Sequence, residues 1–175
     1  GYTEFQPDTL SFLFLLQAWA VRGNVHAAKQ AESILQEMWR LQMEHSDLYI
    51  SPNGNCYHTV MQAWVEASCP PTRENLHSAR TVLWEMWNRF GWGAKWLAPK
   101  TEQYELILSA WYKSNHTNAK EEMQNILVEM RQRKEQYPHL ILEIPKILLD
   151  HQHHHHNDND EPVEKMENKK HPFMP

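Results

Sequence analysis

Glycine, cysteine and long apolar runs are all scarce in this chain of 175 residues, and each shortage excludes a class of protein. Only five glycines are present, and neither a Gly-rich phosphate-binding loop nor an HExxH zinc motif occurs. The two cysteines, Cys56 and Cys69, form no CxxC motif, which indicates buried thiols in a reducing compartment and not a disulfide framework. No stretch approaches about 18 apolar residues, so the sequence predicts no membrane-spanning helix. No candidate nucleophile has a motif around it, so we expect no enzyme activity and no cofactor.

A strong excess of basic charge is also lacking. The formal net charge is −5, and residues 1–136 carry 13 Lys and Arg against 15 Asp and Glu. The remaining residues carry 4 basic side chains against 7 acidic ones. This near balance argues against a large basic face that would attract duplex nucleic acid, but it leaves room for a narrow groove that binds a single strand.

What the chain does contain is one short pattern that occurs three times at a spacing of about 46 residues. Each copy has a proline, an aromatic residue five positions later, and then Ala-Trp at positions eleven and twelve. The three copies are Pro7, Phe12, Ala18 and Trp19; Pro52, Tyr57, Ala63 and Trp64; and Pro99, Tyr104, Ala110 and Trp111. A second pattern that ends in Glu-Met follows each copy, at residues 34–38, 82–86 and 126–130. Two patterns that alternate at a fixed period indicate one structural unit that is repeated.

Both patterns place their apolar residues at helical spacing. In the second copy, Tyr57, Val60, Met61 and Trp64 fall on one face of a helix. Short breakers at residues 22–24, 68–72 and 114–118 separate the two helices of each unit. One helical hairpin cannot bury both of its apolar stripes, so successive hairpins must stack. The sequence therefore predicts an all-α fold, an α-solenoid of antiparallel helical hairpins in a right-handed superhelix.

Polar residues and prolines predict the limits of the units. Asp8, Asn53 and Thr101 can cap the first helices, and Asn118 with Glu121 resembles a capping box. We expect repeats at residues 7–50, 51–98 and 99–136, followed by a capping helix at 137–150. Residues 151–175, rich in His, Asn and Asp, are expected to be a disordered tail. Its histidines lack fixed geometry, so we expect no metal site.

The hairpin pattern resembles the pentatricopeptide repeat. The strongest lines are Pro52-Asn53 to Tyr57 to Ala63-Trp64, and Ala79 to Val82-Leu83 to Glu85-Met86. The resemblance covers roughly residues 7–134, and the long period is similar to the Ala-Trp-containing variant of algae and protists. The nearest other architecture is the tetratricopeptide repeat of 34 residues.

This resemblance implies sequence-directed binding of single-stranded RNA, in organellar RNA processing, stability or translation in a mitochondrion or plastid. The implied base-reading residues are Leu13, Asn53, His58, Lys100 and Glu105, and the implied base-sandwiching residues are Leu10, Asn55 and Glu102. The implied partner is single-stranded RNA, with other proteins as further partners. Neither a membrane nor a small-molecule substrate is expected.

A protein-interaction scaffold on the same hairpin array is the alternative. Leu13 cannot hydrogen-bond a base, and Glu105 would repel a nearby phosphate. A first-helix face that is apolar or negative would favour a protein partner. One lined by Lys100, Lys113 and other cations would favour RNA. His58 is either a surface histidine or a base-stacking residue.

Overall fold

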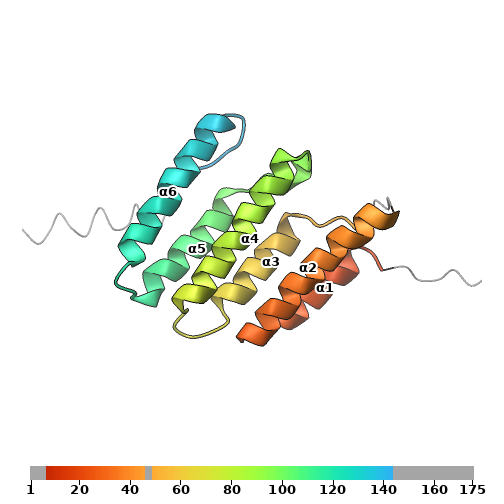
Figure 1. Ribbon diagram of the computed structural model, residues 1–175, viewed down its shortest axis with the longest axis horizontal. Coiled ribbons are helices and arrows are strands. Elements are labelled where there is room, and N and C mark those ends of the chain that lie inside the picture. Colours follow the sequence, from red (N-terminus) through yellow and green to blue (C-terminus); the bar gives the residue numbers. More distant parts are fainter. Residues whose placement is uncertain (1–6, 46–48, 144–175) are drawn as a thin grey trace, which may run out of the picture.

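The computed structural model describes residues 7–45 and 49–143, and within these ranges the regular secondary structure is entirely helical (Figure 1). The helices are α1 (Thr9–Ala20), α2 (Val25–His45), α3 (Gly54–Val65), α4 (Arg73–Gly91), the 3-10 helix η1 (Lys95–Leu97), α5 (Thr101–Ser114) and α6 (Ala119–Gln136). The all-α prediction is therefore confirmed for the described residues. None of their helices has both the length and the apolar character needed to cross a membrane. The predicted tail at 151–175 lies outside the described residues.

Two of the expected caps start their helices. Asp8 accepts a hydrogen bond from the backbone N–H of Ser11 at 2.8 Å, at the start of α1. The Asn53 side-chain oxygen accepts from the N–H groups of Asn55 and Cys56, at the start of α3. Each oxygen satisfies backbone donors that have no partner within the helix.

The other two expected caps are wrong. Thr101 is the first helical residue of α5, and its hydroxyl accepts from the N–H of Glu143 at 3.0 Å instead of capping the helix. Asn118 precedes α6 but makes no side-chain hydrogen bond to its first turn, so the capping box is absent.

The hydrogen bond of Thr101 joins the start of α5 to the segment that follows α6, and an equivalent bond is found at the start of α1. The Thr9 hydroxyl accepts from the N–H of Ser51 at 2.8 Å, across the same 42 residues that separate Thr101 from Glu143. Residues 137–143, the described part of the expected capping helix, are not helical and end in this contact. The rest of that segment, residues 144–150, lies outside the described residues.

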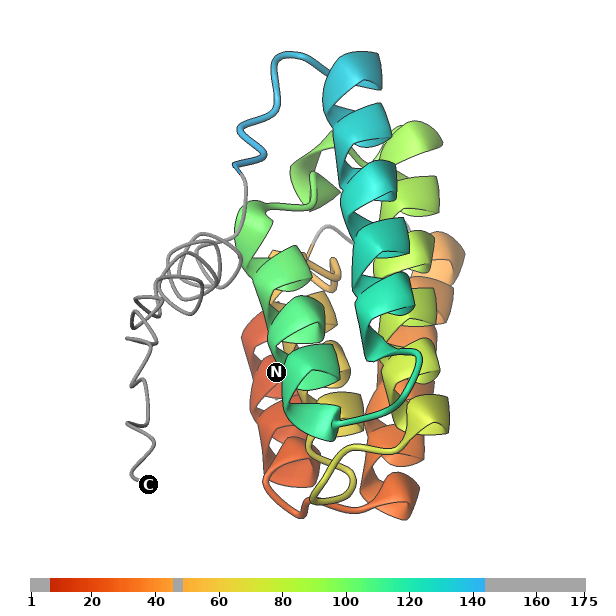
Figure 2. The ribbon, with the colours of Figure 1, turned by 90° about the vertical axis from the view of Figure 1, so that its left-hand side faces the viewer.

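The helices pair as the sequence predicts, α1 with α2, α3 with α4 and α5 with α6. The first helices α1, α3 and α5 pack against one another in that order, and α2 and α4 each also contact the first helix of the next unit. Figures 1 and 2 show the result as two layers, with first helices in one and second helices in the other. Trp19, Trp64 and Trp111 occupy the same position in the three first helices.

The same type of hydrogen bond joins neighbouring units at two places. The indole N–H of Trp39 in α2 donates to the hydroxyl of Tyr57 in α3 at 2.9 Å. That of Trp87 in α4 donates to Tyr104 in α5 at 2.8 Å. All four side chains are buried, and burial raises the pKa of both tyrosines well above the ordinary value. The phenols therefore stay neutral, and their hydroxyl oxygens accept the indole N–H groups.

An arginine from the next second helix covers each of these indoles. The guanidinium of Arg89 lies 4.4 Å from the centroid of the Trp39 ring, and that of Arg133 lies 5.1 Å from the Trp87 ring. Such cation–π contacts stabilise most where the ring is removed from water. We call the two sets clasps: Trp39, Tyr57 and Arg89, and Trp87, Tyr104 and Arg133.

The clasp positions change at both ends of the described array. In the first unit, Phe12 stands where Tyr57 and Tyr104 stand later, and Leu41 stands at the arginine position. In the third unit, Arg131 replaces the tryptophan. Neither outer helix pair therefore carries the half of the clasp that would face a further unit.

Two buried apolar positions of α4 are occupied by lysine in α6. Lys120 and Lys134 of α6 are exposed and stand where α4 buries Leu76 and Phe90. On α1, by contrast, an apolar residue is exposed. Leu15 is 45% exposed, whereas its counterpart in α3, Val60, is buried.

Candidate binding face

The first-helix layer has one face against which no other described helix packs, and residues 140–143 lie at its edge, at the start of α5. Helix α3 lies between α1 and α5 and is backed by α2 and α4, so its remaining accessible side chains point away from the second-helix layer. We call this surface and its equivalents on the two neighbouring helices the open face. It consists of Leu10, Leu13 and Gln17 on α1, Asn55, His58 and Gln62 on α3, and Glu102, Glu105 and Ser109 on α5.

Six of the eight residues implied by the pentatricopeptide resemblance lie on the open face, in two rows across the three helices. The exposed row is formed by Leu10, Asn55 and Glu102. The half-buried row is formed by Leu13, His58 and Glu105. The rows exist because equivalent positions of packed, repeated helices lie side by side.

The other two implied residues, Asn53 and Lys100, precede α3 and α5. The side-chain oxygen of Asn53 already accepts two backbone N–H groups, so mainly its NH₂ donors remain for a ligand. The Lys100 side chain is exposed, and its backbone N–H donates to the Gln103 side chain at 2.8 Å.

His58 is partly embedded in the layer. Its Nδ1 atom is buried and has no hydrogen-bond partner among the described residues. His58 is thus not a fully solvated surface histidine, although its exposed edge lies between Leu13 and Glu105 in the half-buried row.

Charge on the first-helix layer is sparse and gathered at the α5 end. Helices α1 and α3 contain no Asp, Glu, Lys or Arg, while α5 contains Glu102, Glu105 and Lys113. Lys100 is exposed directly before α5, so the α5 end carries two acidic and two basic residues, and no series of cations crosses the three first helices to follow a phosphate backbone. At the α1 end the surface is apolar, because Leu10 and Phe14 are 53% and 59% exposed.

The two cysteines lie in different environments. Cys56 is buried, and burial raises the pKa of its thiol. Cys69, which the sequence predicted to be buried, is exposed because it lies in the surface connection between α3 and α4. Among the described residues, no group of three His, Cys, Asp or Glu side chains could hold a metal ion.

Sequence reasoning missed the clasps, although a signal was present. The second pattern was defined as ending at Glu-Met, one residue before Trp39 and Trp87. Each tryptophan is followed by its tyrosine after 18 or 17 residues, and each arginine comes three residues after a Glu-Met pair. Only the pairing of residues from two different patterns reveals the contact.

No match to this chain is found among protein-family models, curated proteins or solved structures. The pentatricopeptide resemblance and the roles it implies therefore stay predictions.

Proposed function

We propose that this chain is a stretch of α-solenoid, with the right-handed stacking of helical-repeat proteins, and that its open face binds a protein segment. The partner has apolar side chains where it meets α1 and Lys or Arg where it meets α5. The repeated inter-unit clasps support the solenoid, because they join each hairpin to the next in the same way.

The charge distribution of the open face is the observation that carries the choice of partner. Leu10 and Leu13 make its α1 end apolar, and Glu102 places an exposed carboxylate at its α5 end, between Lys100 and Lys113 along the chain. Exposed apolar patches bordered by polar residues are typical of protein contacts. The exposed carboxylate of Glu102 attracts basic segments and repels phosphate.

Selection from a displayed library of random peptides tests this proposal on the intact chain. We expect enriched peptides with apolar residues at one end and Lys or Arg at the other. Glu102→Lys should remove the basic preference, because it replaces the exposed carboxylate of the α5 end with a cation. Glu121→Lys makes the same change on exposed α6 and serves as the matched control. No enrichment, or equal effects of the two variants, would contradict the proposal.

Single-stranded RNA is the second candidate, and the two rows of the open face favour it. Residues at the implied base-reading and base-sandwiching positions align across neighbouring helices, as one-base-per-repeat reading requires. With this candidate comes the mitochondrial or plastid location that the resemblance implies. Salt-sensitive binding of a single-stranded RNA pool, weakened by His58→Ala but not by Gln124→Ala on α6, would favour RNA over the protein partner.

A further inference from the structure

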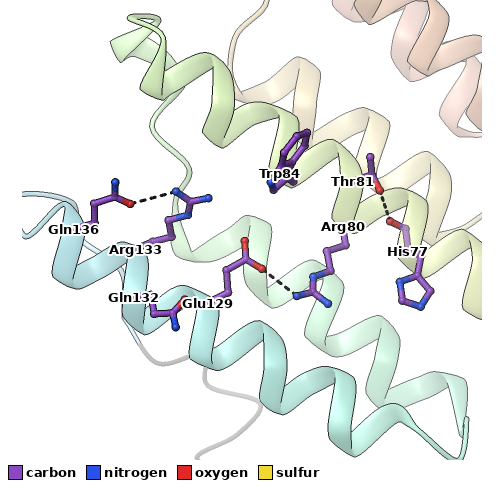
Figure 3. A pocket seen from close by; sticks show the side chains of 8 residues that line it. All are labelled: His77, Arg80, Thr81, Trp84, Glu129, Gln132, Arg133 and Gln136. Atoms are coloured by element: carbon purple, nitrogen blue, oxygen red, sulfur yellow. Dashed lines mark hydrogen bonds and ion pairs between the residues drawn. The ribbon is translucent and has the colours of Figure 1, made fainter.

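A pocket of about 490 Å³ lies in the second-helix layer, between α4 and α6. It is lined by His77, Arg80, Thr81 and Trp84 of α4 and by Glu129, Gln132, Arg133 and Gln136 of α6. Figure 3 shows the α6 side chains facing those of α4 across the pocket. The volume is within the range of small-molecule sites.

The corresponding place between α2 and α4 provides an internal comparison. There, Glu32 of α2 accepts the indole N–H of Trp64 at 2.9 Å. Within α4, Glu85 and Arg89 pair at 3.5 Å. The carboxylates of Glu32 and Glu85 thus both have partners at that interface.

One residue change rearranges these pairs between α4 and α6. Arg80 stands at the position of Glu32, and it forms ion pairs with Glu122 at 3.3 Å and Glu129 at 3.2 Å. Because Arg80 cannot accept a hydrogen bond, the indole N–H of Trp111 is buried without a partner among the described residues.

The same change leaves Arg133 without a carboxylate. Glu129 is the counterpart of Glu85, but it pairs with Arg80, and no described acidic side chain lies within 4.0 Å of the Arg133 guanidinium. Its described polar contact is with the neutral amide of Gln136 at 3.3 Å. Arg73 and Arg80 balance Glu122 and Glu129, so Arg133 is the excess positive charge of the pocket.

The pocket also contains an accessible aromatic surface. Trp84 is 55% exposed, and its counterpart in α2 is Gln36. The side-chain amides of Gln132 and Gln136 line the α6 side of the pocket and offer both donors and acceptors. An indole face, a guanidinium and two amides are suited to a planar polar ring that carries a phosphate.

We propose that this pocket binds a nucleotide, with the base stacked on Trp84 and the phosphate paired with Arg133. The nucleotide is either a nucleoside monophosphate or one residue of single-stranded RNA, since both carry the same chemistry. The site is on the second-helix layer, so it is independent of the open face and of the function proposed for it.

Quenching of tryptophan fluorescence by uridine and adenosine 5′-monophosphates tests the proposal on the intact chain. We expect each monophosphate to bind about tenfold or more tightly than its nucleoside, because the phosphate gains a charged hydrogen bond. Arg133→Gln should lower monophosphate affinity to that of the nucleoside and leave the nucleoside unaffected. Trp84→Leu should weaken both ligands, by about tenfold for the loss of a stacked base, and isothermal titration calorimetry measures this variant.

Arg131→Gln removes a neighbouring α6 cation outside the pocket and should leave affinity unchanged. Arg80→Glu restores the residue type of α2 and releases Glu129 toward Arg133, so it should abolish the phosphate preference.

A comparison with RNA distinguishes the two sources of the nucleotide. A short single-stranded RNA that binds much more tightly than the monophosphates, and depends on Arg133, assigns the RNA source. Equal affinities assign free nucleotides. Equal losses from Arg131→Gln and Arg133→Gln, or equal binding of an aromatic carboxylate such as indole-3-acetate, would overturn the proposal.

Discussion

At the scale of single residues, the contact between neighbouring units depends on buried polar atoms that satisfy each other. An indole N–H that is buried without an acceptor costs about 1–3 kcal/mol. Trp39 and Trp87 avoid this cost only because a tyrosine hydroxyl of the next unit lies within 2.9 Å or less. The aromatic position of the repeat is therefore a polar as well as an apolar contact in the second and third units.

Replacing that hydroxyl should destabilise the fold more than its size suggests. Tyr57→Phe leaves the Trp39 N–H buried without an acceptor, so we expect the free energy of unfolding to fall by about 1–3 kcal/mol. Urea denaturation of Tyr57→Phe, Trp39→Phe and the double variant measures the coupling between the two side chains. Strictly additive losses would show that the hydrogen bond contributes nothing.

The two thiols should differ in reactivity. Burial raises the pKa of Cys56, so less thiolate is present at a given pH, and the thiolate is the reacting form. Cys69 is exposed. We expect a disulfide reagent at pH 8 to modify one thiol rapidly in the native chain and both after denaturation in guanidinium. Mass spectrometry should place the fast modification on Cys69, and fast modification of Cys56 would contradict the packing of α3.

At the scale of elements, the helix starts show what a local pattern can and cannot predict. Asp8 and Asn53 cap α1 and α3 as expected, because a short acceptor next to the first turn can reach its N–H groups. Thr101 lies one position too late, and its hydroxyl is taken by Glu143, which follows it by 42 residues. Such a long-range competitor cannot be read from the residues around the helix start.

The caps of α3 and α5 give a matched pair for mutation. Asn53→Ala removes an acceptor from two N–H groups and should cost about 0.5–2 kcal/mol of stability. Lys100→Ala at the start of α5 removes no side-chain cap and should cost little. Thermal or urea unfolding measures both variants, and equal costs would show that the Asn53 oxygen does not cap α3.

Much of the helical order could be predicted from the sequence, because the proline-to-tryptophan and Glu-Met patterns repeat at fixed spacing. The open face could be predicted only as a set of positions. Its charge depends on residues such as Glu102, which vary where the packing does not restrict them. The charge of the pocket could not be predicted. It depends on Arg80 of α4, which stands where α2 has Glu32, and this difference changes the ion pairs formed by α6.

At the scale of the whole molecule, the two layers have different chemistry. The first-helix layer carries few charges and an apolar α1 end, whereas the second-helix layer holds the linked ion pairs and the pocket. A ligand on one layer therefore need not exclude a ligand on the other. This separation lets variants of the open face and of the pocket be interpreted independently.

Exchange of the tryptophan indole protons with solvent tests the stacked arrangement most directly. NMR of the intact chain should show slow exchange for Trp39 and Trp87, whose N–H groups are buried and bonded to the next unit. Trp92, which is 78% exposed, should exchange rapidly. Tyr57→Phe should accelerate Trp39 and leave Trp87 slow. Exchange of Trp39 and Trp87 as fast as that of Trp92 would contradict the packing of one helical pair on the next.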